Sequence, residues 1–254
     1  MRAFLRTTAA GILALATTVA HASDATPPLR GTVISPAPPA ADFTLTDQAN
    51  RVFHMASTRG KVVLLSFLYT HCTDFCPFLA LKLRETVRLL GTDASGVVVV
   101  PVTTDPARDT PAVLADYSRE IGMYDAWHFV TGPLPVLRKV WSDYAIGVDP
   151  PAASSGGAAT KDFRPSPAPG PGATDSDSSQ ELQDASFGLS QEDREIVAGR
   201  IIARFGGGYE VGHDTPFLLV DRSGRLRAWL NAAATPADIA FDVRSLIAEK
   251  PVTR

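Results

Sequence analysis

Cysteine is nearly absent from this sequence, whose 254 residues contain only Cys72 and Cys76. Two cysteines four positions apart close too small a loop to staple a fold of this length, which excludes a disulfide framework. Structural zinc sites normally add a second pair of cysteines or histidines, and no such pair follows this one. A chain this long can bury its own core without such supports. The two cysteines are therefore predicted to perform local chemistry.

An excess of charge of either sign is also missing. The sequence has 24 Lys and Arg against 27 Asp and Glu, for a formal net charge of -3 and a pI near 5.9. Proteins that bind nucleic acids usually carry a basic surface, so no nucleic-acid partner is expected. The remaining composition, 45% hydrophobic and 20% charged, is typical of a soluble globular protein.

A hydrophobic run long enough to span a membrane is not found at the N-terminus. The uncharged run Ala9–Ala20 has about a dozen residues, and a spanning helix needs roughly 20. Arg2 and Arg6 precede this run, and an A-x-A cleavage pattern, Ala20–Ala22, ends it. We therefore predict a signal peptide at residues 1–22 and an exported, periplasmic protein that is soluble after cleavage. An uncleaved membrane anchor is the less favoured alternative.

Two segments have few large apolar side chains. Residues 23–41 are rich in proline and alanine and are predicted to form an extended leader. Residues 149–188 offer too little apolar surface to offset the entropy of ordering, so they are predicted to be a disordered insertion. The folded domain is expected at residues 42–250, with this insertion inside it.

Within that domain, short apolar runs alternate with amphipathic stretches. Strands are predicted in a hairpin around 47–50 and at 61–69, 96–104, 127–132, 217–220 and 225–230. Helices are predicted at 77–91, 111–122, 134–148, 190–205 and 236–250, with Thr110, Ser190 and Thr235 as N-caps. A βαβα half followed by a ββα half describes a thioredoxin-like fold, an α/β class with a central mixed sheet flanked by helices.

The cysteines lie where the strand 61–69 ends and the next helix begins. Unpaired backbone N–H groups and the positive end of the helix should favour the thiolate of Cys72. Cys76 lies one turn further on, on the same face of a regular helix. Either a disulfide or a shared soft metal ion fits this arrangement.

The spacing of the pair is one residue longer than the C-x-x-C of thiol-disulfide oxidoreductases. Two thiolates alone suit Cu(I), and one added imidazole gives a three-coordinate site for Cu(I) or Cu(II). The choice between redox and metal chemistry therefore depends on whether a histidine reaches the cysteines.

Five histidines are candidates for this role. His21 is removed with the signal peptide, and His54 and His128 are expected to have surface or core roles. His71 adjoins the first cysteine, but at the end of a strand it should point away from its neighbour. His213 precedes the strand 217–220, and a thioredoxin-like sheet would bring its loop to the cysteine helix. From spacing alone, a role as an ordinary loop histidine is equally acceptable.

Three blocks resemble the Sco/SenC family, namely "FLYTHCTDFCP", "TTDPARDTP" and "YEVGHDTPFLLVDRSGRL". This family comprises periplasmic and mitochondrial thioredoxin-like proteins that deliver copper to the CuA centre of cytochrome c oxidase. The resemblance covers residues 42–249. It implies that Cys72, Cys76 and His213 hold one copper ion, Cu(I) or Cu(II), and that the partner is the oxidase subunit that carries CuA. Other periplasmic thiol or copper proteins are further expected partners, and the protein is expected to be a monomer.

Acidic positions of the family's motifs fall on Asp74 and Asp105. For Asp105 and Asp109, a structural role in turns and caps is favoured over direct contact with copper.

The chain departs from the family pattern at two positions, and the second departure keeps another hypothesis open. The family commonly has proline after the first cysteine, where this chain has Thr73. Thr215–Pro216 is more similar to the cis-proline of thioredoxins, which faces their active-site cysteines. The alternative is therefore an enzyme, a thiol-disulfide oxidoreductase with Cys72 as nucleophile and Cys76 as resolving thiol.

Overall fold

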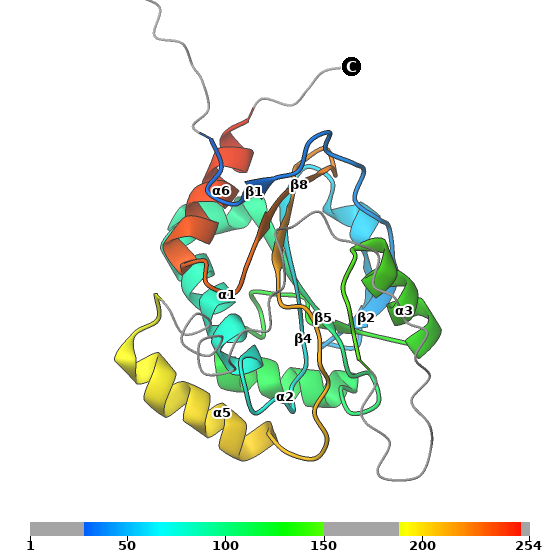
Figure 1. Cartoon of the computed structure of the whole chain (residues 1–254), viewed down its shortest axis with the longest axis vertical. Coiled ribbons are helices and arrows are strands. Elements are labelled where there is room, and N and C mark those ends of the chain that lie inside the picture. The colour runs from blue at the N-terminus through cyan, green and yellow to red at the C-terminus, as the bar shows by residue number, and fades with distance from the viewer. Residues whose placement is uncertain (1–27, 150–187, 250–254) are drawn as a thin grey trace, which may run out of the picture.

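A computed structural model describes residues 28–149 and 188–249 and shows a central sheet with helices on both faces (Figure 1). The strands are β1 (Thr32–Val33), β2 (Thr44–Asp47), β3 (Val52–His54), β4 (Val62–Leu68), β5 (Val97–Thr103), β6 (Val130–Thr131), β7 (Phe217–Val220) and β8 (Leu226–Leu230). The helices are η1 (Met55–Thr58), α1 (Cys76–Leu90), η2 (Gly91–Gly96), α2 (Pro111–Ile121), α3 (Leu134–Asp143), η3 (Asp193–Val197), α5 (Ala198–Phe205) and α6 (Pro236–Ala248).

The eight strands form one mixed sheet in the order β1-β8-β7-β4-β5-β6-β2-β3. At its centre β4 and β5 run parallel, in a register that places Leu68 opposite Thr103, while β7 pairs with the other side of β4 in the antiparallel sense. Every residue of β4 is buried, as expected for a continuous apolar run between two neighbours. The predicted thioredoxin-like fold with a mixed sheet is confirmed.

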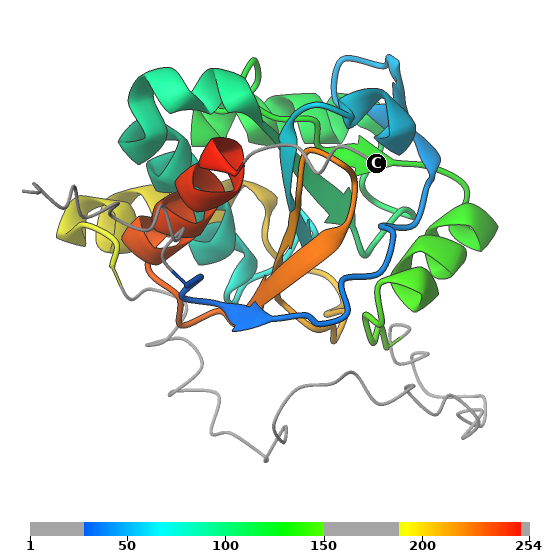
Figure 2. The same cartoon turned by 90° about the horizontal axis from the view of Figure 1, so that it is seen from above.

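Helices lie on both faces of the sheet (Figures 1 and 2), and a hydrophobic layer lies on each face. The side chains of β4 alternate between them, because successive residues of a strand point to opposite faces. Leu64 and Leu68 pack with α1, α2, α5 and α6, whereas Leu65 and Phe67 pack with α3 and the β2–β3 hairpin. The cysteines belong to the first layer.

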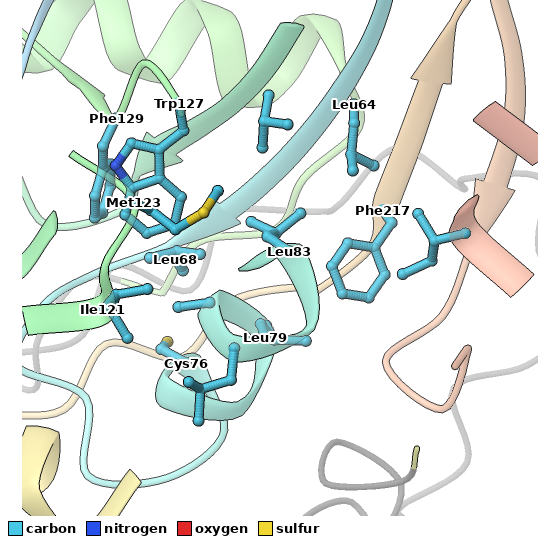
Figure 3. Packing of buried hydrophobic residues seen from close by; sticks show 14 of the residues in the cluster. Leu64, Leu68, Cys76, Leu79, Leu83, Ile121, Met123, Trp127, Phe129 and Phe217 are labelled. Carbon is cyan, nitrogen blue, oxygen red and sulfur yellow. The ribbon is translucent and has the colours of Figure 1, made fainter. Parts of the chain in front are cut away.

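Helix α1 is the most deeply buried helix next to the site. Figure 3 shows Cys76, Leu79 and Leu83 along the helix, near Met123 and the aromatic residues beyond it, and all three are fully buried. Lys82 is buried as well, and its ammonium donates to the backbone carbonyls of Ala232 and Ala234 before α6. These bonds satisfy a charge that would otherwise be costly to bury, and they fix α1 to the C-terminal part of the sheet.

The predicted N-caps are present. The hydroxyls of Thr110 and Thr235 accept from the backbone N–H groups of the third residue of α2 and α6, and Thr235 completes a capping box with Asp238. Ser190 accepts from the backbone N–H of Asp193, at 3.1 Å. The carboxylate of Asp193 pairs with Arg84 of α1.

Residues 23–41 are predicted to form an extended leader, but part of this segment is folded onto the domain. Residues from Arg30 onward dock on the domain: β1 pairs with β8, and the N–H groups of Arg30 and Gly31 donate to the carboxylate of Asp242, at 2.7 and 2.9 Å. The folded part therefore begins before the predicted boundary at residue 42. Backbone pairing rather than apolar burial holds β1, since Val33 is 53% exposed, and the composition of the segment therefore does not predict this strand.

Other predictions concern residues outside the described ranges. The predicted signal peptide and nearly all of the predicted insertion lie there. Over residues 28–149 and 188–249 no helix combines the length and the apolar character required to cross a bilayer. The cis peptide bond of the described residues is Ser35–Pro36, so Thr215–Pro216 is trans and lacks the thioredoxin-like cis bond.

Candidate metal and thiol site

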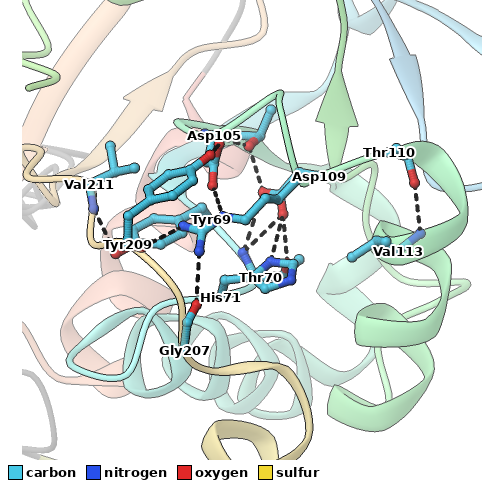
Figure 4. Close-up of polar contacts among 12 residues, drawn as sticks. Tyr69, Thr70, His71, Asp105, Asp109, Thr110, Val113, Gly207, Tyr209 and Val211 are labelled. Carbon is cyan, nitrogen blue, oxygen red and sulfur yellow. Dashed lines mark hydrogen bonds and ion pairs between the residues drawn. The ribbon is translucent and has the colours of Figure 1, made fainter. Parts of the chain in front are cut away.

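The loop that carries the cysteines is fixed at its base by Asp109, which is fully buried. Its carboxylate accepts from the backbone N–H of Thr70, at 3.3 Å, and from the hydroxyls of Thr70 and Thr103, both at 2.6 Å (Figure 4). Because Thr70 follows β4 and Thr103 ends β5, Asp109 ties the ends of the two central strands together. Its role is structural, as expected, although it is a tie between strands rather than a helix cap.

Cys72 lies in the turn before α1 and is only 3% exposed. The pKa of its thiol is lowered by a hydrogen bond from Cys76 and by backbone N–H groups, including that of Asp74 at 3.4 Å from Sγ. Cys76, the first residue of α1, is fully buried, and burial raises the pKa of its thiol. The two free cysteines therefore differ in acidity, with Cys72 the more acidic thiol of the pair.

His213 reaches the cysteines from a position 137 residues further along the chain. Its Nε2 lies 3.4 Å from Sγ of Cys76, and its Nδ1 lies 2.9 Å from the backbone carbonyl oxygen of Asp214. A carbonyl only accepts, so Nδ1 carries the proton and Nε2 presents a lone pair toward the sulfur. Burial lowers the pKa of His213, which keeps the ring neutral and able to bind a metal.

A short backbone bridge holds His213 in place. Val148 and His213 form an isolated antiparallel bridge. The N–H of Asp149 donates to the carbonyl of Gly212, at 2.7 Å, and the N–H of Asp214 donates to that of Gly147, at 3.1 Å. This bridge joins the chain after α3 to the histidine loop.

Asp105 and Arg108 hold the beginning of the same loop. Arg108 donates to the backbone carbonyls of Gly207 and Tyr209, both at 2.8 Å, and its guanidinium lies 3.7 Å above the centre of the Tyr209 ring. Asp105 accepts from Arg108 and from the Tyr209 hydroxyl, the latter at 2.8 Å (Figure 4). Asp105 therefore positions the histidine loop, in agreement with its expected structural role.

Two residues of the site were not predicted, Tyr69 and Glu210. The Tyr69 hydroxyl donates to the Glu210 carboxylate and accepts from the N–H of Val211, at 3.1 Å. The Tyr69 ring meets the His213 ring edge-on, with 5.7 Å between their centres. In the sequence, Tyr69 ends an apolar run and Glu210 is one of many charged loop residues. Neither position therefore shows a pattern that predicts a place in the site.

The other histidines of the described residues, His54, His71 and His128, have partners other than the cysteines. His54 bonds to the Thr44 hydroxyl at 2.9 Å, and His128 lies 3.1 Å from the carboxylate of Asp47. His71 turns to the Thr70 hydroxyl, at 2.8 Å.

The donor atoms of the site fit a soft metal, but they are not closed around one. Two sulfurs and a neutral imidazole nitrogen suit copper. Cys76 makes both contacts, with Cys72 and with His213. Among the described residues no three His, Cys, Asp or Glu side chains are arranged closely enough to form a metal site. Cys72 and His213 would have to move together around Cys76 to hold an ion.

Paired cysteines at the start of a helix, facing a histidine from a distant loop, define a class of thioredoxin-like thiol and metal proteins. A family model described as SCO1/SenC matches residues 32–162, so the chain belongs to the SCO1/SenC family.

Similar proteins agree with this assignment. A "SCO2-like protein" of Rickettsia felis is 38% identical over 76 residues, which is 30% of this chain and 37% of that protein. The structure of Bradyrhizobium japonicum ScoI with copper bound is matched over 82% of this chain and 98% of that one, with 23% identity and a TM-score of 0.56. BsSco, described as having a disulfide switch and as a member of the Sco family of cytochrome c oxidase assembly proteins, is matched over 86% and 99%, with 18% identity and a TM-score of 0.54.

Proposed function

We propose that this protein is an exported, periplasmic copper-binding protein that delivers copper to the CuA site of cytochrome c oxidase. The observation that carries the proposal is the 3.4 Å contact between Cys76 Sγ and His213 Nε2, with the ring neutral and its lone pair turned to the sulfur. The copper-bound ScoI relative and the oxidase-assembly description of BsSco support it. The partner is the oxidase subunit that carries CuA, and other periplasmic copper or thiol proteins are further candidates.

In this function copper is the cargo and the three side chains are its ligands. The Cys72 thiolate offers the first bond, because its pKa is lowered, and Cys76 gives up its proton as it binds. His213 adds Nε2 without losing a proton, since its proton is on Nδ1. Copper leaves by exchange of these ligands for thiolates of the partner. Loading requires both cysteines in the reduced form, so copper binding is linked to redox state.

The test is a Cu(I) titration of the reduced protein against a competing chelator. The wild type should bind one Cu(I) tightly, and Cys76→Ser and His213→Ala should each weaken that site by at least about tenfold. His54→Ala is the matched control, because the His54 side chain is exposed and its ring bonds to the Thr44 hydroxyl, away from the cysteines. Affinity unchanged in His213→Ala, or lost equally in His54→Ala, would contradict the proposed ligand set.

A second candidate function, a thiol-disulfide oxidoreductase, is favoured by the difference between the two thiols. Cys72 has the lowered pKa of an attacking thiolate, and Cys76 is a protonated neighbour that could resolve a mixed disulfide. The substrate would be the cysteines of CuA or of another exported protein. Reductase activity that survives His213→Ala in a protein that binds Cu(I) only weakly would favour the enzyme over the copper carrier.

A further inference from the structure

Thr73, the residue after Cys72, lies against the loop between α5 and His213. Its hydroxyl donates to Oε1 of Glu210, at 2.9 Å. Its methyl group lies 2.9 Å from the position that a side-chain carbon on Gly206 would occupy. The hydrogen bond therefore depends on the Thr73 hydroxyl, which a side chain without a donor cannot replace.

Glu210 makes the second half of the connection. One carboxylate oxygen accepts from Thr73 and the other from the hydroxyl of Tyr69, so both oxygens are used. Tyr69 and Thr73 lie on the two sides of Cys72 in the sequence. Glu210 therefore bridges the cysteine loop at a point three residues before His213.

The loop needs such a connection because its glycines allow many backbone conformations. Gly207 and Gly208 both have positive φ, at 114° and 85°, a region that glycine enters at no steric cost. Arg108 holds only the beginning of the loop, at Gly207 and Tyr209. Between Tyr209 and the bridge at Gly212, the loop is linked to the cysteine loop through two neighbouring residues. Glu210 accepts from the hydroxyls of Tyr69 and Thr73, and the N–H of Val211 donates to the Tyr69 hydroxyl, at 3.1 Å.

We propose that Thr73 and Glu210 form a positioning latch that sets the separation of His213 from Cys72, and so allows the imidazole to act as the third copper ligand. This inference rests on the proposed copper function. Neither latch residue touches the ion: both act through His213. The latch works by reducing the conformations open to the histidine loop before copper binds, which lowers the entropic cost of closing the site.

The experiment is a double-mutant cycle on Cu(I) affinity, measured with the chelator competition described above. Thr73→Val keeps the methyl contact and removes the hydroxyl, whereas Thr73→Ser keeps the hydroxyl. Thr73→Val should weaken copper binding by about tenfold, as the loss of a residue that orients a ligand typically does, and Thr73→Ser should stay near the wild type. In the His213→Ala background, Thr73→Val should have no further effect.

Glu210→Leu provides an independent variant, because an apolar side chain of similar size accepts neither of the two hydrogen bonds. It should weaken binding in the same direction, again only when His213 is present. Thr92→Val, on an exposed threonine of η2, controls for a general effect of the substitution. Thermal unfolding of each variant separates loss of affinity from loss of the fold.

The outcomes separate the two proposals. A wild type that does not bind Cu(I) tightly, or binds it independently of His213, contradicts the copper function. Tight, His213-dependent binding that Thr73→Val leaves unchanged contradicts the latch alone. An equal loss from Thr73→Val with and without His213 contradicts it too, since the hydroxyl would then act on the cysteines rather than on the histidine.

Discussion

Cys72 and Cys76 have the same side chain in different surroundings. Cys72 receives hydrogen bonds from Cys76 and from backbone N–H groups, which lower the pKa of its thiol. Cys76 is enclosed by the first hydrophobic layer, and burial raises the pKa of its thiol. The surroundings therefore shift the pKa values of the two thiols in opposite directions.

This difference predicts selective alkylation. Only the thiolate is the nucleophile, so a lowered pKa makes Cys72 reactive at lower pH than a free thiol, while Cys76 should remain unmodified in the folded protein. The measurement is the rate of modification by iodoacetamide as a function of pH, with the labelled peptide identified by mass spectrometry. N-acetylcysteine is the reference.

Cys76→Ala tests the cause, because it removes the hydrogen bond that lowers the pKa of Cys72 most. The midpoint of the Cys72 rate profile should then move to higher pH. A midpoint that stays in place would assign the effect to the helix N-terminus instead.

At the scale of elements, the segment before β2 is anchored to the last helix. Asp242 of α6 is fully buried and accepts from the backbone N–H groups of Arg30 and Gly31. Strand β1 then pairs with β8, and the backbone N–H of Leu226 donates to the carbonyl of Pro38, at 2.9 Å. The anchor at Asp242 is the first of these contacts along the chain.

Asp242→Ala should therefore destabilise the protein by about 1–3 kcal/mol, the range for leaving hydrogen-bonding groups without their partner. The measurement is urea unfolding, with hydrogen exchange at Gly31 and Val33 as the local readout. Asp116→Ala is the control, because Asp116 pairs with Arg119 on an exposed surface, where ion pairs contribute little. Unchanged stability together with unchanged exchange would show that this segment does not depend on its anchor.

The sequence predicted the elements whose own residues carry a pattern. The run in β4 and the caps at Thr110 and Thr235 are local features, and the structure confirms them. Strand β1 has two residues, both exposed, and its stability comes from a partner strand almost 200 residues away, which no local pattern records.

The site was predictable to a similar extent. Cys72 and Cys76 stood out by their spacing, and His213 through the expected sheet and the family resemblance. The sequence marks Thr73 only as a departure from that family. It does not predict the hydrogen bond of Thr73, because the partner, Glu210, lies 137 residues away. Such a contact depends on side-chain directions at the end of a loop, which neither periodicity nor composition contains.

Over the whole molecule, several carboxylates are more acidic in the folded state. Hydrogen bonds from Arg51 and His128 lower the pKa of Asp47 despite its burial, and those from Ser223, Arg225 and Arg227 do the same for Asp221. A carboxylate whose pKa is lower folded than unfolded stabilises the protein above the unfolded value, near 4. That contribution is lost as the pH falls through the folded pKa.

The free energy of unfolding should therefore fall as the pH is lowered from about 5 through 4 and below. Urea unfolding followed by circular dichroism at several pH values measures this slope. Asp221→Asn should make the slope shallower. The pKa of Asp242 is raised by burial, so its contribution runs in the opposite direction, and Asp242→Asn should make the slope steeper. The same slope in all three proteins would contradict this assignment.

The buried ammonium of Lys82 affects the order in which the three ligands would release copper. It holds α1 to the carbonyls of Ala232 and Ala234, so the helix cannot turn or slide without stranding a charge in the core. Cys76, the first residue of that helix, is thus a stationary donor, whereas Cys72 and His213 lie on loops outside the helix. In the proposed transfer, the bonds from copper to Cys72 and His213 break first and the bond to Cys76 breaks last. An incoming thiolate of the partner would therefore replace the loop ligands before the helix ligand.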